Sequence, residues 1–263
     1  KSLIKMTEIL HSKIVGSGEK HLLVFHGLFG QLDNWNTIGK HFGEHFTTHL
    51  IDLRNHGRSF HSEDSSLAAM TQDIVNYMDA NSIETAHLLG HSLGGRIVIE
   101  FAMIHQNRLD HLIVADMAPK AYQPHHNAIF KALKSVDFNQ VKSRKEVEAI
   151  LEQYIPEVGV RQFLLKNVYH AENGQYAFRF NLPVLDKFYH EMIGSELLKG
   201  QFNGPTLFLG GANSNYILPE DEMNIKGRFP KAEIKKIANA GHWLHAENPK
   251  DFTAEILDFL LNK

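Results

Sequence analysis

Cysteine is absent from this sequence of 263 residues. Its absence excludes disulfide bonds, thiolate metal sites and a cysteine nucleophile, so any nucleophile must use oxygen or nitrogen. An excess of one charge sign is also lacking, because 27 Lys and Arg residues face 30 Asp and Glu residues and leave a formal net charge of −3. A chain without a basic excess is not expected to bind nucleic acid or an anionic membrane surface.

Long hydrophobic runs are missing as well. No stretch of the sequence approaches the ~20 apolar residues that a membrane span needs. Residues 1–10 interleave charged and apolar side chains, which is unlike a signal peptide. We therefore expect a cytoplasmic protein without a membrane span. With 43% hydrophobic and 22% charged residues, the composition is that of a globular chain.

Short aliphatic runs are present and recur along the chain, each ending near glycine or a small polar residue. They cover residues 21–26, 47–52, 86–89, 112–115, 206–209 and 234–237. Such runs predict parallel strands that are buried on both faces. Apolar residues with helical spacing lie between several of them, at 67–78, 97–104 and 252–261. Because strand and helix alternate, the sequence predicts an α/β fold with a mostly parallel sheet flanked by helices.

Two regions depart from this alternation. Residues 3–15 alternate polar and apolar side chains and lead to Gly16-Ser17-Gly18, which predicts an antiparallel edge hairpin before the parallel sheet. Residues 119–203 contain helix-like segments and no clear aliphatic strand, which predicts an inserted helical cap. The chain then divides into a first core part at 1–118, the cap, and a second core part at 204–263.

The motif Gly90-His91-Ser92-Leu93-Gly94 fits G-x-S-x-G. It follows the apolar run 86–89 and precedes an amphipathic stretch at 96–104, which is the strand–turn–helix setting of a serine nucleophile. A plain glycine-rich turn has the same letters, but the setting favours Ser92 as the nucleophile. The N–H of Leu93, at the start of the helix, then points toward an oxyanion formed at the serine.

A serine hydroxyl needs a base that takes its proton, and in this setting the chain order is serine, acid, histidine. His242 follows Ala240-Gly241 just after the last strand candidate, at 234–237. That position places it on a loop at the carboxyl end of a strand, so we predict that it is the base. Its neighbour His245 is assigned a structural role.

The early loop His26-Gly27-Leu28-Phe29-Gly30 closes a strand candidate and carries two glycines. A loop of this type offers a second backbone donor to the oxyanion, and the N–H of Leu28 is the candidate beside that of Leu93. Phe29 and Trp243 adjoin the loop and the base, so we predict that they line the substrate pocket.

The acid is the least obvious member of the triad. Asn213 stands after the strand candidate 206–209, where an aspartate is expected, and an amide carries no charge. Asp116 ends the preceding strand candidate and is favoured, with Asp221 as the fallback and a helix-capping role as the alternative reading of Asp116. Ser214 is placed to hydrogen-bond the imidazole or Asp116 as a fourth member.

Taken together, these residues make the sequence similar to the α/β-hydrolase superfamily over essentially its whole length, and within it to the YbfF group of bacterial esterases. The motifs are His26 to Gly30, Asp52-Leu53-Arg54-Asn55-His56-Gly57-Arg58-Ser59, Gly90 to Gly95, Asp116-Met117-Ala118-Pro119, Asn213-Ser214 and Gly241-His242-Trp243. The resemblance implies the α/β-hydrolase fold, a helical cap after the sixth strand, the acid at Asp116 and a triad joined by Ser214. Residues 52–59 are shared by members with different chemistry and say little about the substrate.

The expected activity is that of a serine carboxylesterase acting on a small acyl ester, without cofactor or metal. An acyl-CoA thioesterase, a carbon–carbon hydrolase, a lyase and a cofactor-free haloperoxidase remain alternatives. Ser92 excludes the related enzymes that use an aspartate nucleophile. A binding module without catalysis is less favoured. The segment His41-Phe42-Gly43-Glu44-His45 fits the zinc pattern H-x-x-E-H, but Gly43 weakens the helix that would present the ligands.

Overall fold

The computed structural model describes residues 6–263. Its strands are β1 (Ser12–Val15), β2 (His21–Phe25), β3 (Thr47–Ile51), β4 (Ala86–His91), β5 (Leu109–Ala115), β6 (Val168–His170), β7 (Tyr176–Phe178), β8 (Thr206–Gly211) and β9 (Ala232–Ile237). Seven of them form one twisted sheet in the order β1-β3-β2-β4-β5-β8-β9. All neighbours are parallel except β1 and β3, which confirms the predicted α/β fold.

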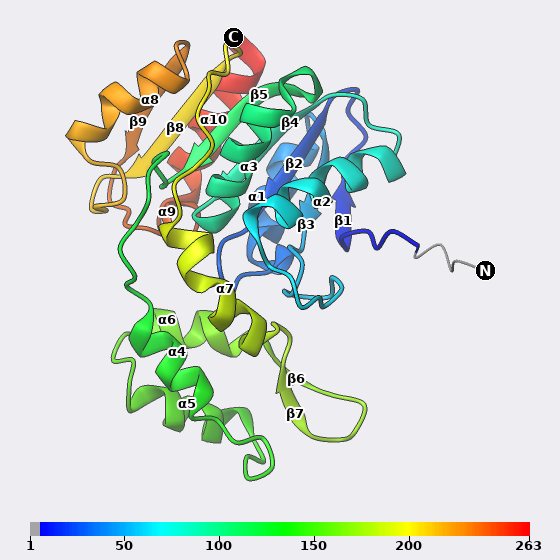
Figure 1. Ribbon diagram of the computed structural model, residues 1–263, viewed down its shortest axis with the longest axis vertical. Helices are drawn as coiled ribbons and strands as arrows, with labels where there is room; N and C mark the ends of the chain where they lie inside the picture. The colour runs from blue at the N-terminus through cyan, green and yellow to red at the C-terminus, as the bar shows by residue number, and fades with distance from the viewer. Residues whose placement is uncertain (1–5) are drawn as a thin grey trace.

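Helices cover both faces of this sheet, as Figure 1 shows. They are α1 (Asn36–Gly43), α2 (Leu67–Ala80), α3 (Leu93–Ile104), α4 (Asn127–Lys134), α5 (Arg144–Glu152), α6 (Val158–Leu165), α7 (Leu182–Gly194), α8 (Glu222–Arg228), α9 (Leu244–Glu247) and α10 (Pro249–Asn262), with short 3-10 turns η1 (Leu32–Trp35), η2 (Gln106–Arg108) and η3 (Pro219–Asp221). Within residues 6–263, no helix has the length and apolar character to cross a bilayer.

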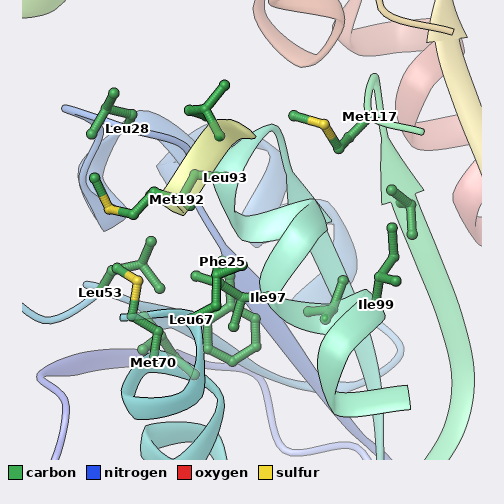
Figure 2. Close-up of a cluster of buried hydrophobic side chains, with 14 of the residues drawn as sticks. Phe25, Leu28, Leu53, Leu67, Met70, Leu93, Ile97, Ile99, Met117 and Met192 are labelled. Atoms are coloured by element: carbon green, nitrogen blue, oxygen red, sulfur yellow. The ribbon is translucent and has the colours of Figure 1, made fainter. Parts of the chain in front are cut away.

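Helix α3 lies at the centre of the larger hydrophobic cluster. Every residue from Leu93 to Ala102 is buried, so the helix has no solvent-facing side over most of its length. Figure 2 shows Leu93 and Ile97 of α3 in the same cluster as Phe25 of β2 and Met70 of α2. A helix packed on all sides is held rigidly. The residue that precedes it, Ser92, therefore has a fixed position.

The predicted edge hairpin is wrong in its pairing. Strand β1 is antiparallel, as expected, but its partner is β3 rather than the next strand, β2. Strand β2 already has β3 and β4 as neighbours, so its edges are occupied by parallel strands. A short strand at the edge is free to pair with any exposed neighbour, and local alternation does not identify which one. Residues 3–5 of the predicted hairpin lie outside the described residues.

Between β5 and β8 the chain leaves the sheet and forms a separate group of helices, drawn at the bottom of Figure 1. We call residues 119–203 the insert. It contains α4 to α7 and also a small antiparallel hairpin, β6–β7, which the sequence did not predict. The hairpin strands have three residues each, too few for a periodic pattern. The strand before the insert is β5, the fifth that the structure describes, where the resemblance implies the sixth strand of the family pattern.

Candidate active site

Ser92, Asp116 and His242 follow β4, β5 and β9, so all three lie at the carboxyl edge of the parallel sheet. Ser92 has φ 55° and ψ −117°, a strained conformation for a residue with a side chain. Glycine is required around it, because a Cβ on Gly90 would lie 2.2 Å from the carbonyl oxygen of Gly94. A Cβ on Gly94 would lie 2.4 Å from the carbonyl oxygen of Phe25. Close packing of strand and helix thus explains both glycines of the motif.

The three side chains form a continuous hydrogen-bonded chain. The Nδ1 atom of His242 lies 2.7 Å from Oδ2 of Asp116, and its Nε2 lies 3.0 Å from Oγ of Ser92. A carboxylate only accepts hydrogen bonds, so Nδ1 carries the proton and the lone pair of Nε2 faces the serine hydroxyl. Asp116 is fully buried, whereas His242 is partly exposed. This arrangement is able to remove a proton from Ser92.

Two further donors hold the carboxylate of Asp116. The N–H of Gly211, at the end of β8, donates to Oδ1 at 3.0 Å. The hydroxyl of Ser214 donates to Oδ2 at 2.5 Å, so the structure places Ser214 against Asp116 rather than against the imidazole. The fallback acid, Asp221, is engaged elsewhere: its carboxylate pairs with Lys120 at 2.8 Å and accepts from the N–H of Leu218 at 2.7 Å.

The loop after β2 lies directly against Ser92. A Cβ added to Gly27 would be 3.0 Å from the Cβ of Ser92, so the loop approaches closely only because this residue is glycine. The next residue is Leu28, and the first residue of α3 is Leu93. Within residues 6–263, neither of their N–H groups donates to a backbone or side-chain acceptor. Both donors are therefore available to a ligand at Ser92.

Sequence reasoning did not identify two aromatic neighbours of His242. The ring of Tyr216 stacks on the imidazole with centroids 3.8 Å apart and an interplanar angle of 15°. His91, inside the serine motif, places Nε2 2.8 Å from the carbonyl oxygen of His242. Burial lowers the pKa of His91 to about 3, so its ring is neutral and donates that hydrogen bond. Both contacts form between residues far apart in the chain, so a single sequence gives no signal that marks them.

His245 stacks its ring on Trp35 at 4.1 Å, nearly parallel, and burial lowers its pKa well below the ordinary value. Its packing matches the structural role expected for it. The zinc pattern does not form a cluster, because α1 ends at Gly43 and leaves His45 outside the helix that carries His41. No group of three His, Asp or Glu suited to a metal occurs among residues 6–263.

A cavity of about 320 Å³ opens beside Ser92 and His242. The predicted pocket residues Phe29 and Trp243 both line it, and Trp243 packs on Phe163 of the insert with ring centroids 5.2 Å apart. The insert contributes a large share of the wall, with His126, Ile129, Gly159, Val160, Gln162, Phe163, Leu164 and Lys166. A molecule bound at Ser92 would therefore contact both the core and the insert.

A family model described as alpha/beta hydrolase fold matches residues 20–141. The chain is 37% identical to the sn-1-specific diacylglycerol lipase ABHD11 of Danio rerio over 93% of this chain and 80% of that protein. It is 36% identical to Esterase YbfF of Escherichia coli over 87% of this chain and 88% of that protein.

A solved structure, described as a marine microorganism esterase, superposes with a TM-score of 0.93 at 38% identity. The match covers 96% of this chain and all of that one. Identity above 30% over most of both chains shows common descent and not only a common architecture. The chain belongs to the α/β-hydrolase family.

Proposed function

We propose that this protein is a serine carboxylesterase that hydrolyses acyl esters through an acyl-enzyme intermediate. The observation that carries the proposal is the chain from Ser92 Oγ to His242 Nε2 (3.0 Å) and from His242 Nδ1 to the buried Asp116 (2.7 Å). Relatives that are named esterase and lipase support the same reaction class. Ser92 is the nucleophile, His242 the general base and Asp116 the acid that orients it.

In the first half-reaction, Ser92 Oγ attacks the acyl carbonyl carbon while His242 Nε2 takes the hydroxyl proton. The carbonyl oxygen becomes an oxyanion, which the N–H groups of Leu28 and Leu93 stabilise. The tetrahedral intermediate collapses, His242 gives the proton to the leaving alkoxide, and the acyl group stays on Ser92. Asp116 stabilises the imidazolium that exists between the two proton transfers.

In the second half-reaction, a water molecule takes the place of the alcohol. His242 removes its proton, the oxygen attacks the acyl carbon, and Ser92 recovers its proton as the carboxylic acid leaves. Ser214 acts indirectly, because its hydrogen bond of 2.5 Å holds the carboxylate oxygen that faces the imidazole. The chain supplies every proton carrier that this sequence of steps needs.

The insert is the second part of the proposal. Residues 119–203 act as a cap over the two core parts, 1–118 and 204–263, and Phe29 and Trp243 contact the substrate from the core side. The contribution of the insert to the cavity wall supports this division. A small acyl ester is the proposed substrate. That the protein is cytoplasmic, binds no nucleic acid and works without cofactor or metal stays a prediction from the sequence.

The test is labelling with an organophosphonate, which mimics acylation of the nucleophile. We expect intact mass and peptide mapping to find a single adduct on Ser92, and Ser92→Ala to fold normally but form no adduct and lose ester turnover. An adduct elsewhere, or turnover by Ser92→Ala, would contradict the assignment. A panel of esters and acyl-CoA thioesters, run on the same samples, separates a carboxylesterase from a thioesterase by kcat/KM.

A further inference from the structure

The conformation of Phe29 depends on support from outside its own loop. Its φ of 63° lies in the left-handed region, which is unfavourable for a residue with a side chain. Its N–H donates to Nε2 of His56 at 3.1 Å. The other ring nitrogen of His56 lies 2.9 Å from the carbonyl oxygen of Arg54, so Nδ1 must carry the proton and Nε2 must accept.

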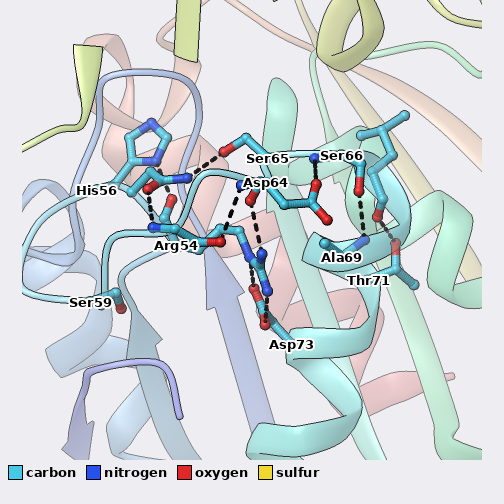
Figure 3. Close-up of polar contacts among 12 residues, drawn as sticks. Arg54, His56, Ser59, Asp64, Ser65, Ser66, Ala69, Thr71 and Asp73 are labelled. Atoms are coloured by element: carbon cyan, nitrogen blue, oxygen red, sulfur yellow. Dashed lines mark hydrogen bonds and ion pairs between the residues drawn. The ribbon is translucent and has the colours of Figure 1, made fainter. Parts of the chain in front are cut away.

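His56 belongs to residues 52–59, a motif for which the sequence predicted no role in the reaction. Burial lowers the pKa of His56 to about 3, so the ring is neutral and its acceptor nitrogen is preserved at neutral pH. The carboxylate of Asp52 accepts from the N–H of Leu32 at 2.7 Å and from that of Arg58 at 2.9 Å. Figure 3 shows the paired contact of Arg54 with Asp73 that fixes the same segment, at 2.6 and 2.7 Å.

The insert supports the loop from the opposite side through Asn167, which follows α6 and is 1% exposed. Its Nδ2 donates to the carbonyl oxygen of Phe29 at 2.8 Å. A carbonyl only accepts, so the amide nitrogen must face the loop. Within residues 6–263, Oδ1 of Asn167 has no hydrogen-bond partner, although it is buried. An unpartnered buried oxygen is destabilising. The same Nδ2 also donates to the carbonyl oxygens of Leu164 at 3.2 Å and Phe163 at 3.5 Å, so the side chain joins the end of α6 to the loop.

From Phe29 a hydrogen-bonded path leads to the proposed oxyanion donor. The peptide group that Asn167 contacts joins Phe29 to Gly30, and its N–H donates to the carbonyl oxygen of Gly27 at 3.0 Å. That carbonyl, which also accepts from Nδ1 of His26 at 2.7 Å, belongs to the peptide group between Gly27 and Leu28, whose N–H is the proposed oxyanion donor. Hydrogen bonds in such a series orient and polarise one another. The amide of Asn167 is thus two peptide groups away from the N–H of Leu28.

We infer that Asn167 is a positioning residue for the oxyanion hole, through which the docked insert fixes and polarises the N–H of Leu28. The inference rests on the proposed function of Leu28 as an oxyanion donor. It gives the insert a second role beside covering the cavity, because transition-state stabilisation then depends on the insert being in place.

The test compares Asn167→Leu with Asn181→Leu. Leucine matches asparagine closely in shape, so Asn167→Leu removes the donor to Phe29 and the unpartnered oxygen together. Asn181 is a matched control, since its Nδ2 also joins the insert to the core, at Oδ1 of Asn55 at 3.1 Å. Asn55 belongs to residues 52–59, but among residues 6–263 Asn181 has no hydrogen bond with residues 26–30 or with His56. We expect Asn167→Leu to lower kcat by about 10- to 100-fold with little change in KM, and Asn181→Leu to leave kcat nearly unchanged.

A second readout reports on the oxyanion hole itself. Sulfur is larger than oxygen and a weaker hydrogen-bond acceptor, so an intact hole discriminates against the thiono analogue of an ester substrate. We expect the ratio of kcat/KM for the oxygen ester to that for the thiono ester to fall in Asn167→Leu and to stay at the wild-type value in Asn181→Leu. A role confined to anchoring the insert would not move this ratio.

Equal kinetics and equal ester-to-thiono ratios in the two variants would overturn the inference. If Asn167→Leu does not fold, Asn167→Ala against Asn181→Ala gives the same comparison, with thermal unfolding of each variant as the check on folding. Failure of the proposed function has a different signature. A wild-type protein without ester turnover, or turnover that survives Ser92→Ala, would overturn both proposals at once.

Discussion

At the scale of single residues, the carboxylate of Asp116 is held from three directions. Its Oδ1 accepts from Gly211, and its Oδ2 accepts from both Ser214 and His242. The oxygen that orients the imidazole therefore has a second, independent restraint. Ser214 is itself restrained, because its Oγ accepts from the N–H of Tyr216 at 3.2 Å. The hydroxyl thus links the carboxylate to the residue whose ring stacks on His242.

Replacing Ser214 should weaken catalysis without abolishing it. We expect Ser214→Ala to lower kcat about tenfold, the value of one hydrogen bond to a charged group, because Asp116 keeps its contacts with Gly211 and His242. Steady-state kinetics with an activated ester measures the effect. Ser214→Thr retains the hydroxyl and should recover most of the activity. A loss as complete as that of Ser92→Ala would show that Ser214 does more than restrain the carboxylate.

At the scale of elements, Arg96 of α3 forms hydrogen bonds with residues at both ends of the insert. The guanidinium is fully buried one turn after Ser92. It donates to the carbonyl oxygen of Lys120, where the insert begins, and to those of Met192 and Ser195, near its end. Burial lowers the pKa of Arg96 to about 10, so the group is still charged at neutral pH. A rigid, planar donor thus joins three carbonyls from the two ends of the insert.

Removing this residue should loosen the insert. We expect Arg96→Met to lower the free energy of unfolding by about 3–5 kcal/mol, because one buried and two partly buried carbonyl groups lose their donor. Urea unfolding measures the change, and limited proteolysis should cut Arg96→Met within residues 119–203 faster than the wild type. Arg96→Lys keeps the charge but not the fork of donors, so an intermediate loss is expected. An unchanged rate of proteolysis within residues 119–203 of Arg96→Met would contradict the claim that Arg96 holds the insert on α3.

At the scale of the whole molecule, several buried histidines have a pKa well below the ordinary value. Burial lowers the pKa of His26, His49 and His87 to about 4 and that of His56 to about 3. In the unfolded chain these rings recover their ordinary pKa of 6.5, so unfolding takes up protons at any pH between the two values. The free energy of unfolding should therefore be highest above pH 6.5 and fall as the pH falls toward 4.

The slope of this decline is measurable. Each such histidine contributes about 1.4 kcal/mol per pH unit between its folded and unfolded pKa. Urea unfolding at pH 7.5, 6.5, 5.5 and 4.5 should show a steepening loss of stability. His87 lies on β4 against Phe46 and His111, away from Ser92. His87→Leu should therefore reduce the slope of the unfolding free energy against pH by the contribution of one histidine, about 1.4 kcal/mol per pH unit. Stability independent of pH across this range would contradict the neutral state of the buried rings.

Much of the architecture depends on patterns within a few neighbouring residues, and these are visible in the sequence. The six runs correctly predicted the parallel strands, and five of those strands are largely buried because burial on both faces demands continuous apolar side chains. The predicted burial of 234–237 is wrong, because β9 is an edge strand whose Lys235 is partly exposed and whose Lys236 is exposed. The glycines on either side of Ser92 predicted the turn that the structure shows, because only a missing Cβ allows β4 and α3 to pack so closely. Ser92, Asp116 and His242 were each predicted from a position just after a strand candidate, because the carboxyl ends of parallel strands meet at one edge of a sheet.

Other features depend on residues that meet only after folding. The partner of β1, the hairpin β6–β7 and the stack of Tyr216 on His242 left no local signal, because edge pairing and long-range contacts have no characteristic spacing. Asn167 is 138 positions from the carbonyl oxygen that it binds. The sequence by itself thus determined the fold class and the three residues that we propose for the triad, through short-range burial and backbone sterics. Tertiary structure alone decided the cavity wall and the support of the oxyanion loop, since both arise where the insert packs on the core.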